Sequence, residues 1–383
     1  MLNDNMETRV SIEIGNQTVV AALGYVSDAG DVKVVDVDMA PTEGYSFGTI
    51  TDKTSLMQCL YALVTKVCKD VSLRSGVIQF VVPAECVSSV ERTITLKSVK
   101  CLDQRTLQNA AAQCKKELAL SEEFEIIDMI PSGLRADGVE IESIKAVDNI
   151  SQLELTWRVF YMKSAVANEW MELFDLFKAA SVAFIPYERA CGEAFRALSD
   201  SKELTIVDLG ADSERVLHYN GGMLKLAERL RLGADTIDKD ITIAYKLSLD
   251  DAKRLKMSHG EAMLCTCKMD HVSLPDGINE CKTKELMLVI QSRLEELYEG
   301  VIYQLQQSGY GKGKAVLVGG GNNLKNSDLL FKMLSGMEVV RTKYICNAKS
   351  ESPLMVKEFA AAIGVLGCDT QNDEPVKSSW RFW

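Results

Sequence analysis

Two acidic residues, each followed two positions later by a glycine, have the type and spacing that could do chemistry in this chain. Asp208 and Gly210 end one apolar run, and Glu13 and Gly15 end another, 195 residues earlier. A carboxylate at the end of a strand can hold a metal-bound water, and the neighbouring glycine lets backbone N–H groups face an anion. The pattern therefore predicts two sites that could bind phosphate groups.

Each acidic turn is expected to join the first two strands of a three-stranded meander. The later meander covers 204–228 and turns again at Asn220-Gly221-Gly222, and the earlier one covers 10–37 and turns again at 27–31. Asp and Gly are ordinary turn residues, so one such hairpin would indicate no more than a connection between strands. Because the pattern occurs twice, it indicates two related domains that face each other across a cleft.

Composition limits the classes of protein that this chain can represent. A chain of 383 residues can form two domains with inserted subdomains, and 47% hydrophobic and 25% charged residues are ordinary for globular proteins. The formal net charge of −11, with no cluster of Lys and Arg, excludes a general nucleic-acid binder. A small anionic ligand remains compatible with this charge, because backbone amides and a cation can bind it locally.

The eleven cysteines indicate a reducing compartment. They form no C-x-x-C pair, and no signal peptide is recognisable at the N-terminus, so we expect mostly buried free thiols and a cytoplasmic protein. Cys265 and Cys267 could join His271 and Cys281 at a metal, but the spacing fits no common zinc site. No run approaches the roughly 20 apolar residues that span a bilayer.

Hydrophobic periodicity predicts an α/β layer in the first half of the chain, interrupted by a small α+β subdomain at 84–162. The expected elements are a helix at 55–71, a strand at 77–83, a helix at 103–118, strands at 124–130 and 153–161, a helix at 164–181, a strand at 182–185 and a helix at 188–198.

The second half predicts helices around one short buried strand. Helices are expected at 233–245, from Ser248 onward, at 283–307 and at 358–367, with a strand at 315–318. This strand leads into Gly319, Gly320 and Gly321, which either let a ligand approach the backbone or let a neighbouring helix pack tightly. The polar stretch 369–379 has the composition of a disordered segment.

The order of these features resembles the actin-like ATPase superfamily, and within it the FtsA family of bacterial cell-division proteins. The resemblance covers residues 10–367. It is carried by 127–138 with 153–155, by 231–241, by 251–256 with Gly260, and by 290–297 with 308–310 and 318–321.

The resemblance implies a duplicated, ribonuclease H-like α/β fold with two domains around a nucleotide cleft and an FtsA-type inserted subdomain. The expected organisation is a first domain at 1–83 and 163–200, the insert at 84–162, a second domain at 201–352 whose outer, partner-binding part is about 240–308, a returning helix at 353–368, and a flexible tail at 369–383.

The resemblance also implies a role in cell division. FtsA proteins bind ATP, assemble into filaments, bind the C-terminal peptide of FtsZ through the second domain, and attach to the inner face of the cell membrane through a C-terminal tail. In this chain the tail ends with Trp380, Phe382 and Trp383 beside cations, which suits a lipid headgroup interface. A tail this short should bind weakly alone and gain from many copies in a filament, and the alternative is an exposed or back-folded terminus.

Carried over residue by residue, the resemblance assigns ATP and Mg²⁺ to the two hairpins and to the residues that follow them, with no catalytic base assigned. The expected nucleotide-binding residues are Glu13, Gly15, Asn16, Gln17, Asp208, Gly210, Ser213, Gly233, Lys256, Gly319, Gly320 and Gly321, and Glu13 and Asp208 would hold the metal.

Several positions depart from the family pattern. Thr18 replaces a lysine, and Ala211 and Asp212 replace glycines. Asp212 and Glu214 should bring negative charge toward a triphosphate, unless Arg215 compensates it rather than pointing away. On the adenine side, Lys253 replaces a glutamate. We therefore expect a degenerate cleft that binds ATP weakly or not at all and turns it over negligibly.

Two other interpretations remain open at this point. A sugar or acid kinase of the same superfamily would need a carboxylate base beside a sugar pocket, and the insert and the altered hairpins disfavour it. A cytoplasmic scaffold of pilus assembly related to FtsA would share the inserted subdomain, would lack an aromatic tail and would bind a short peptide of a membrane partner.

Overall fold

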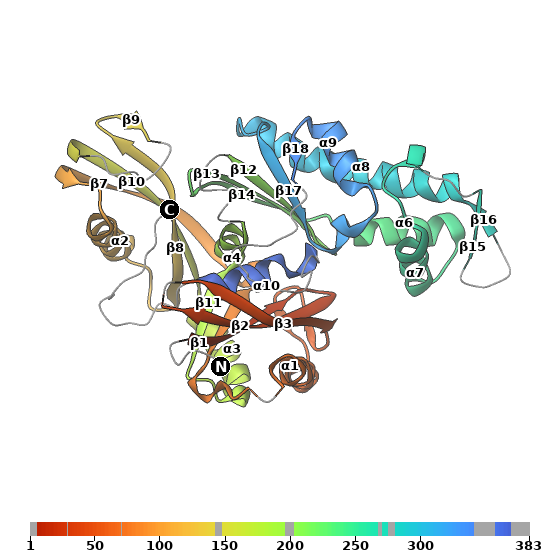
Figure 1. Cartoon of the computed structure of the whole chain (residues 1–383), viewed down its shortest axis with the longest axis horizontal. Coiled ribbons are helices and arrows are strands. Elements are labelled where there is room, and N and C mark those ends of the chain that lie inside the picture. Colours follow the sequence, from red (N-terminus) through yellow and green to blue (C-terminus); the bar gives the residue numbers. More distant parts are fainter. Residues whose placement is uncertain are drawn as a thin grey trace. The chain divides into compact units, whose positions relative to one another are not determined.

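The computed structural model describes residues 6–28, 30–69, 71–141, 148–195, 203–266, 270–274, 280–340 and 357–368. The chain divides into two units (Figure 1). The first comprises 1–202, 219–225 and 343–383, and the second comprises 203–218 and 226–342.

The first unit is built on a five-stranded sheet with the order β11-β6-β1-β2-β3. Its strands are β1 (Met6–Ile14), β2 (Thr18–Ser27), β3 (Val32–Pro41), β6 (Val77–Val82) and β11 (Ser181–Pro186). β1, β2 and β3 form an antiparallel meander, and β6 and β11 continue the sheet in parallel. All six residues of β6 are buried, as expected for a strand that is covered on both faces.

Helices cover both faces of this sheet. α1 (Lys53–Cys68) buries a stripe of leucines and valines, and Asp52 caps it by accepting hydrogen bonds from the N–H groups of Thr54 and Ser55. α1 and α3 (Ser164–Phe174) share one hydrophobic core, whereas α4 (Tyr187–Ala194) and α10 (Ala360–Gly364) pack together on the other side. The helix expected at 164–181 is shorter, because a 3-10 turn follows it and Lys178 is left-handed.

The second unit repeats this topology. Its sheet has the order β14-β13-β12-β17-β18, so that again three consecutive strands are followed by two parallel ones. The strands are β12 (Leu204–Leu209), β13 (Glu214–Asn220), β14 (Met223–Leu230), β17 (Lys314–Val318) and β18 (Glu338–Val339). The duplicated α/β fold predicted from the sequence is confirmed.

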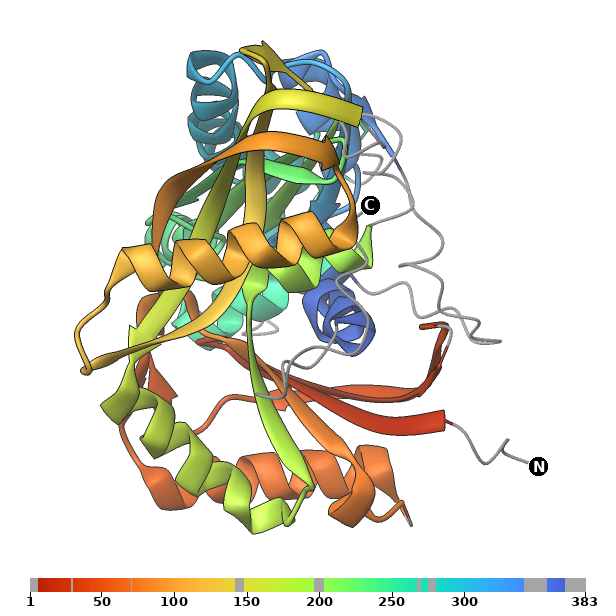
Figure 2. The same ribbon diagram turned by 90° about the vertical axis from the view of Figure 1, so that its left-hand side faces the viewer.

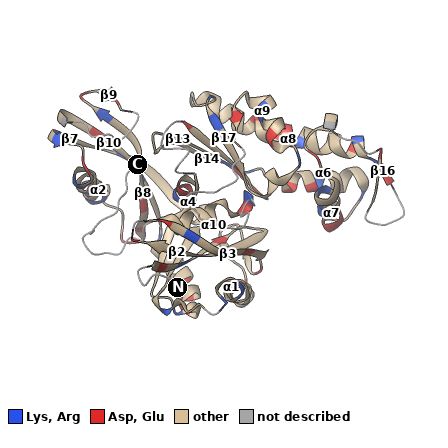
Figure 3. Ribbon diagram, viewed as in Figure 1, with Lys and Arg blue, Asp and Glu red and all other residues tan. Residues whose placement is uncertain are grey.

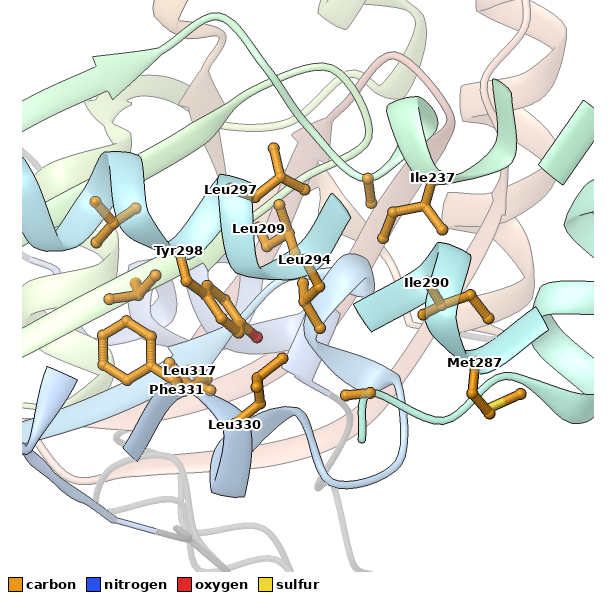
Figure 4. Packing of buried hydrophobic residues seen from close by; sticks show 14 of the residues in the cluster. Leu209, Ile237, Met287, Ile290, Leu294, Leu297, Tyr298, Leu317, Leu330 and Phe331 are labelled. Atoms are coloured by element: carbon orange, nitrogen blue, oxygen red, sulfur yellow. The ribbon is translucent and has the colours of Figure 1, made fainter. Parts of the chain in front are cut away.

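The core of the second unit is organised by its longest helix, α8 (Thr283–Gln307). The side chains of Ile290, Leu294 and Leu297 project into a core that also holds Leu209 and Phe331 (Figure 4). The remaining helices are α6 (Asp235–Tyr245), α7 (Leu249–His259) and α9 (Ser327–Ser335), and a short hairpin is formed by β15 (His271–Ser273) and β16 (Glu280–Lys282). Acidic and basic residues are interspersed along these helices (Figure 3).

The inserted subdomain is a four-stranded sheet with the order β7-β10-β8-β9, and α2 packs against it (Figure 2). Its elements are β7 (Ser88–Cys101), α2 (Gln104–Leu118), β8 (Phe124–Ala136), β9 (Val139–Glu140) and β10 (Asp148–Lys163). The strand β7 was not predicted from the sequence, and β8 and β10 were expected to be shorter. Arg189 on α4 holds Asp128 on β8 with two hydrogen bonds of 2.7 and 2.9 Å.

Residues 219–225, at the turn between β13 and β14, belong to the first unit. Met223 is fully buried in the core of the inserted subdomain, beside residues such as Trp157. Lys225 Nζ lies 3.0 Å from the carboxylate of Glu140, and the Tyr219 hydroxyl donates a 2.5 Å hydrogen bond to the carbonyl of Glu188. Residues on either side of the predicted turn at 220–222 therefore contact the insert, through Met223 and Lys225, and α4, through Tyr219.

The last described residues are fixed by buried hydrogen bonds. Arg9 on β1 donates to the carbonyls of Leu366 and Cys368, at 2.9 and 2.6 Å, and Gln79 on β6 donates to Cys368 at 2.7 Å. The helix expected at 358–367 is α10 flanked by two 3-10 turns.

The membrane residues expected from the sequence, Trp380, Phe382 and Trp383, lie outside the described residues. None of the described helices is long and apolar enough to cross a membrane.

Candidate nucleotide site

The two acidic hairpins have the same turn. Between β1 and β2 the N–H of Gly15 donates to the carbonyl of Thr18 at 2.9 Å, and between β12 and β13 the N–H of Gly210 donates to the carbonyl of Ser213 at 2.9 Å. In both turns a Cβ on the glycine would approach that carbonyl oxygen within 3.2 Å, so glycine fits best. The predicted repeat therefore extends from the topology to individual hydrogen bonds.

The first hairpin is in contact with the segment that follows β3. The Asn16 side-chain oxygen accepts a 2.7 Å hydrogen bond from the N–H of Phe47. Thr42 donates to Gly15 through its hydroxyl, at 2.7 Å, and to Gln17 through its backbone, at 3.0 Å. The side-chain oxygen of Asn16 is therefore already used, and its predicted contact with a nucleotide would have to come from its amide N–H groups.

The turn of the second hairpin rests on the start of α6. The N–H groups of Ala234 and Asp235 donate to the carbonyls of Gly210 and Ala211 at 2.9 and 2.8 Å. A Cβ on Gly233 would overlap the carbonyl of Ala211. Gly233 was expected to serve the cofactor, and packing of the turn against α6 is sufficient to require it.

The charges around this turn differ from what the sequence suggested. Glu214 is 1% exposed, and burial, with the Asp208 carboxylate as a second cause, raises the pKa of Glu214 to about 9. At neutral pH Glu214 is therefore protonated, and the expectation that it brings negative charge to a triphosphate is wrong. Asp212 has a cationic partner in Arg229 on β14, 3.5 Å away.

The three consecutive glycines pack against the end of β12. Gly319 has a φ of +83°, and a Cβ there would overlap Asp208 and the carbonyl of Leu209. A Cβ on Gly321 would overlap the side chain of Leu209. Gly320 begins a 3-10 turn that continues to Asn323. These glycines were expected either to let a ligand approach or to let a neighbouring helix pack tightly. Tight packing accounts for Gly319 and Gly321, but they pack mainly against the end of the strand β12 and not against a helix.

Asn322 follows these glycines, and its role was missed in the sequence. Its fully buried side chain accepts a 2.6 Å hydrogen bond from the Tyr298 hydroxyl and donates to the carbonyls of Val207 and Val318. A polar residue directly after a buried strand and a glycine run was the available signal. Asn322 connects β12, β17 and α8, and thereby fixes the strand end that carries Asp208.

Lys256, expected on the adenine side, lies in a buried ion pair. Its Nζ is 2.7 Å from the carboxylate of Asp238, which is 1% exposed, between α6 and α7. Burial raises the pKa of Asp238, and the Lys256 ammonium opposes that rise. Lys256 therefore joins two helices of the second unit, and its role toward a nucleotide stays a prediction.

The residues present fit a phosphate ligand in part. The turns at Gly15 and Gly210 and the carboxylates of Glu13 and Asp208 are kept, and the burial of Glu214 removes one negative charge. Glu13 belongs to the first unit and Asp208 to the second, and within the described ranges no cluster of three or more His, Cys, Asp or Glu residues could hold a metal. Binding of Mg²⁺ by these two carboxylates stays a prediction.

Comparison with known proteins finds similarity to the family that the motifs resemble. Residues 205–364 match the family model of cell division protein FtsA. Cell division protein FtsA of Bacillus subtilis is 24% identical over 338 residues, which are 83% of this chain and 74% of that protein. The Escherichia coli K12 protein of the same name is 23% identical over 327 residues, 78% of this chain and 73% of that one.

Solved structures share the fold at lower identity. A chain of the PilM-PilN type IV pilus biogenesis complex superposes with a TM-score of 0.65 at 16% identity and covers 94% of this chain and 97% of its own length. MreB5 of Spiroplasma citri bound to AMPPNP superposes with a TM-score of 0.52 at 10% identity, over 94% of both chains. The resemblance to FtsA and the actin-like ATPase fold are confirmed.

Proposed function

We propose that this chain, an actin-like protein related to cell division protein FtsA, is a division scaffold that links FtsZ to the inner face of the cytoplasmic membrane and assembles into filaments. The observation that carries the proposal is the similarity to FtsA proteins over most of the chain, which includes the second domain. The duplicated fold with an inserted subdomain supports it, because it supplies the framework that the family uses.

The surface proposed for the C-terminal peptide of FtsZ lies on α6 and α7. Ile243 on α6 is 77% exposed and Met257 on α7 is 83% exposed, although both side chains are apolar. Exposed apolar residues surrounded by charged ones commonly mark protein interaction sites. Lys239 on α6 and Lys246 directly after it are exposed, whereas the exposed Arg254 on α7 is paired with Asp251, 2.5 Å away. We propose that the two lysines meet acidic residues of the peptide while Ile243 and Met257 contact its apolar ones.

A binding measurement with labelled FtsZ C-terminal peptide tests this surface. Fluorescence anisotropy should report binding to the full chain and at least about a tenfold weaker affinity for the double variant Ile243→Ser/Met257→Ser. Met333→Ser is the matched control, because Met333 is an exposed methionine, 58% exposed, on a different helix of the same unit, α9. No binding to the unaltered chain would refute the proposed link to FtsZ.

Membrane attachment is proposed for the aromatic residues at the end of the sequence. The comparison should use the full chain and a chain that ends at Cys368, because the Cys368 carbonyl is held by Arg9 and Gln79 and must be kept. We expect the full chain to sediment with anionic vesicles and the shortened chain to stay in the supernatant. Equal sedimentation of both would contradict the anchor.

For the nucleotide we propose weak or absent ATP binding with negligible hydrolysis. Glu13 and Asp208 would hold hydrated Mg²⁺, which would neutralise phosphate charge, and the turns at Gly15 and Gly210 would face the phosphates. Calorimetric titration with ATP and Mg²⁺ tests this. Micromolar affinity together with steady phosphate release would show that the departures in the two hairpins do not impair the site.

A pilus-assembly scaffold is the second candidate, favoured by the superposition on a chain of the PilM-PilN complex over 97% of its length. This function predicts binding of a short cytoplasmic peptide from a PilN-like membrane protein. The same anisotropy assay with such a peptide distinguishes the two candidates. Binding of the PilN-like peptide without binding of the FtsZ peptide would select the pilus scaffold.

A further inference from the structure

The inserted subdomain presents a long edge strand. β7 spans the 14 residues Ser88–Cys101 and lies at the end of the strand order β7-β10-β8-β9. Within the described part of the chain, β10 is the strand that pairs with β7. Most residues of β7 are exposed, and only Ile94 and Val99 are buried. An edge strand of this kind offers its outer backbone N–H and C=O groups for pairing with another strand.

The edge strand β7 carries charged residues, as protected edges commonly do, but it lacks the proline that limits pairing at another edge of the same unit. On the edge strand β3, Asp36 and Asp38 are bound by lysines of α1 and its C-cap, and Pro41 ends the strand. β7 contains no proline, and its Val, Ile and Thr residues favour extended backbone. Ser98, with a φ of +53°, interrupts the regular strand, which leaves 88–97 for pairing.

One face of β7 is polar and already organised into rows across the sheet. Glu91 lies 2.9 Å from Arg158 of β10, and the hydroxyls of Thr93 and Thr156 are 2.9 Å apart. Residues 95 and 97, a threonine and a lysine, continue this exposed face, whereas Ile94 points to the opposite face and joins the core beneath α2. A strand added at the edge would extend these rows.

We propose that β7 pairs antiparallel with β7 of a second copy of this chain, across a two-fold axis at Ile94, so that the two four-stranded sheets become one. In this register Glu91 lies opposite Lys97 of the other copy, twice by symmetry, and Thr93 lies opposite Thr95. Opposite charges and Thr pairs at facing positions stabilise antiparallel strands. The interface is self-complementary, as a closed two-fold dimer requires.

Geometry limits the registers that β7 can adopt with its own copy. A two-fold axis perpendicular to the sheet keeps each side chain on the same face of the joined sheet in both copies. Because side chains alternate between the faces along a strand, the sequence numbers of two facing residues must differ by an even number. A register is therefore defined by the one residue that faces itself across the axis.

Charge then favours the register centred on Ile94. A register centred on residue 91, 92 or 97 places that charged residue opposite the same residue of the second chain, so that like charges meet. The register centred on residue 96 places Arg92 opposite Lys100, which are also like charges. In the register centred on Ile94, Arg92 faces Leu96 of the other copy, so no like charges meet. This register also places opposite charges at both ends of the paired segment.

Two charge-reversal variants of the full chain test the proposal. Glu91→Lys places lysines opposite each other in the dimer, and Lys97→Glu places glutamates opposite each other. Each variant alone should dimerise roughly tenfold more weakly than the unaltered chain in sedimentation velocity. An equimolar mixture of the two variants should recover the affinity, because every facing pair at these positions then again joins a lysine to a glutamate.

Lys100→Glu is the matched control, because it makes the same charge change on the same strand beyond Ser98, and it should leave the affinity unchanged. Circular dichroism confirms that each variant folds, which matters for Glu91→Lys because it also loses the contact with Arg158. A chain that stays monomeric, or variants that do not recover on mixing, would overturn the proposal. So would growth to filaments without a dimer that responds to these changes. The proposal does not depend on the link to FtsZ, which uses α6 and α7.

Discussion

The buried carboxyl group of Glu214 makes the stability of the second unit depend on pH. Glu214 lies at the start of β13, 1% exposed, beside Asp208. Within the described residues no hydrogen-bond partner is found for its Oε1 atom. The substitution Glu214→Gln keeps the size of the side chain and removes its ability to ionise.

The sign and size of the effect follow from the two pKa values. The pKa of Glu214 is raised from 4.5 to about 9 in the folded chain, so between these values the folded state holds a proton that the unfolded state has released. Below pH 4.5 both states hold the proton, and Glu214 does not lower the free energy of unfolding. Between pH 4.5 and about 9 the free energy of unfolding falls as the pH rises, by at most about 1.4 kcal/mol per pH unit. At pH 7 the loss amounts to about 3 kcal/mol. Glu214→Gln abolishes this loss, because glutamine does not ionise. Burying its amide group can lower the free energy of unfolding, but by the same amount at every pH, so the pH dependence isolates the effect of the carboxyl group.

Urea unfolding of the full chain at pH values of about 5.5, 7 and 8.5 measures the effect. Pulsed hydrogen exchange with mass spectrometry should be the probe, followed on peptides from β12 and β17, because these strands belong to the second unit. We expect the free energy of unfolding of the variant, relative to the unaltered chain, to increase steadily from the lowest to the highest pH.

Glu228→Gln is the control, because Glu228 is an exposed glutamate on β14 of the same sheet. It should leave the pH dependence as it is in the unaltered chain. If Glu214→Gln and the unaltered chain show the same dependence on pH, then Glu214 is ionised in the folded protein, and the conclusion that it adds no negative charge to the hairpin is refuted.

Three further substitutions test the contacts that shape the two units. Tyr298→Phe removes the buried hydrogen bond to Asn322 and should lower the free energy of unfolding by about 1–3 kcal/mol in urea titrations. Arg189→Met leaves Asp128 buried without its cation and should cost about 3–5 kcal/mol, visible as earlier unfolding of the inserted subdomain in hydrogen exchange. Gly233→Ala forces a Cβ into the turn of the second hairpin and should lower the midpoint of thermal unfolding by several degrees, at a cost of about 1–3 kcal/mol.

Much of the fold could be predicted because its signals are local or repeated. The spacing of Glu13 and Gly15 recurs at Asp208 and Gly210, and the structure gives both turns the same hydrogen bond. The leucine and isoleucine stripe of α8 was equally clear. The strand β7 could not be predicted because most of its residues are exposed, so few of them are apolar. Arg92 also interrupts the alternation of apolar and polar residues that would indicate a strand.

The candidate site was harder to predict, because its properties depend on contacts between distant segments. The bond from Phe47 to Asn16 joins a loop to a hairpin 31 positions earlier, and no local pattern marks it. The burial of Glu214, in contrast, has a signal in the sequence that was overlooked. Along β13, Glu214 shares one face with Val216 and His218, and both of these are fully buried.

The hydrogen bonds at the end of the described chain have a mechanical consequence. Arg9 and Gln79 bind the Cys368 carbonyl from β1 and β6, which are neighbouring strands inside the sheet of the first unit. A pulling force applied to the chain after Cys368 is therefore transmitted to the middle of that sheet and not to its rim. Strands bonded on both sides resist such a load together, so the first unit can bear tension at this point without peeling from an edge.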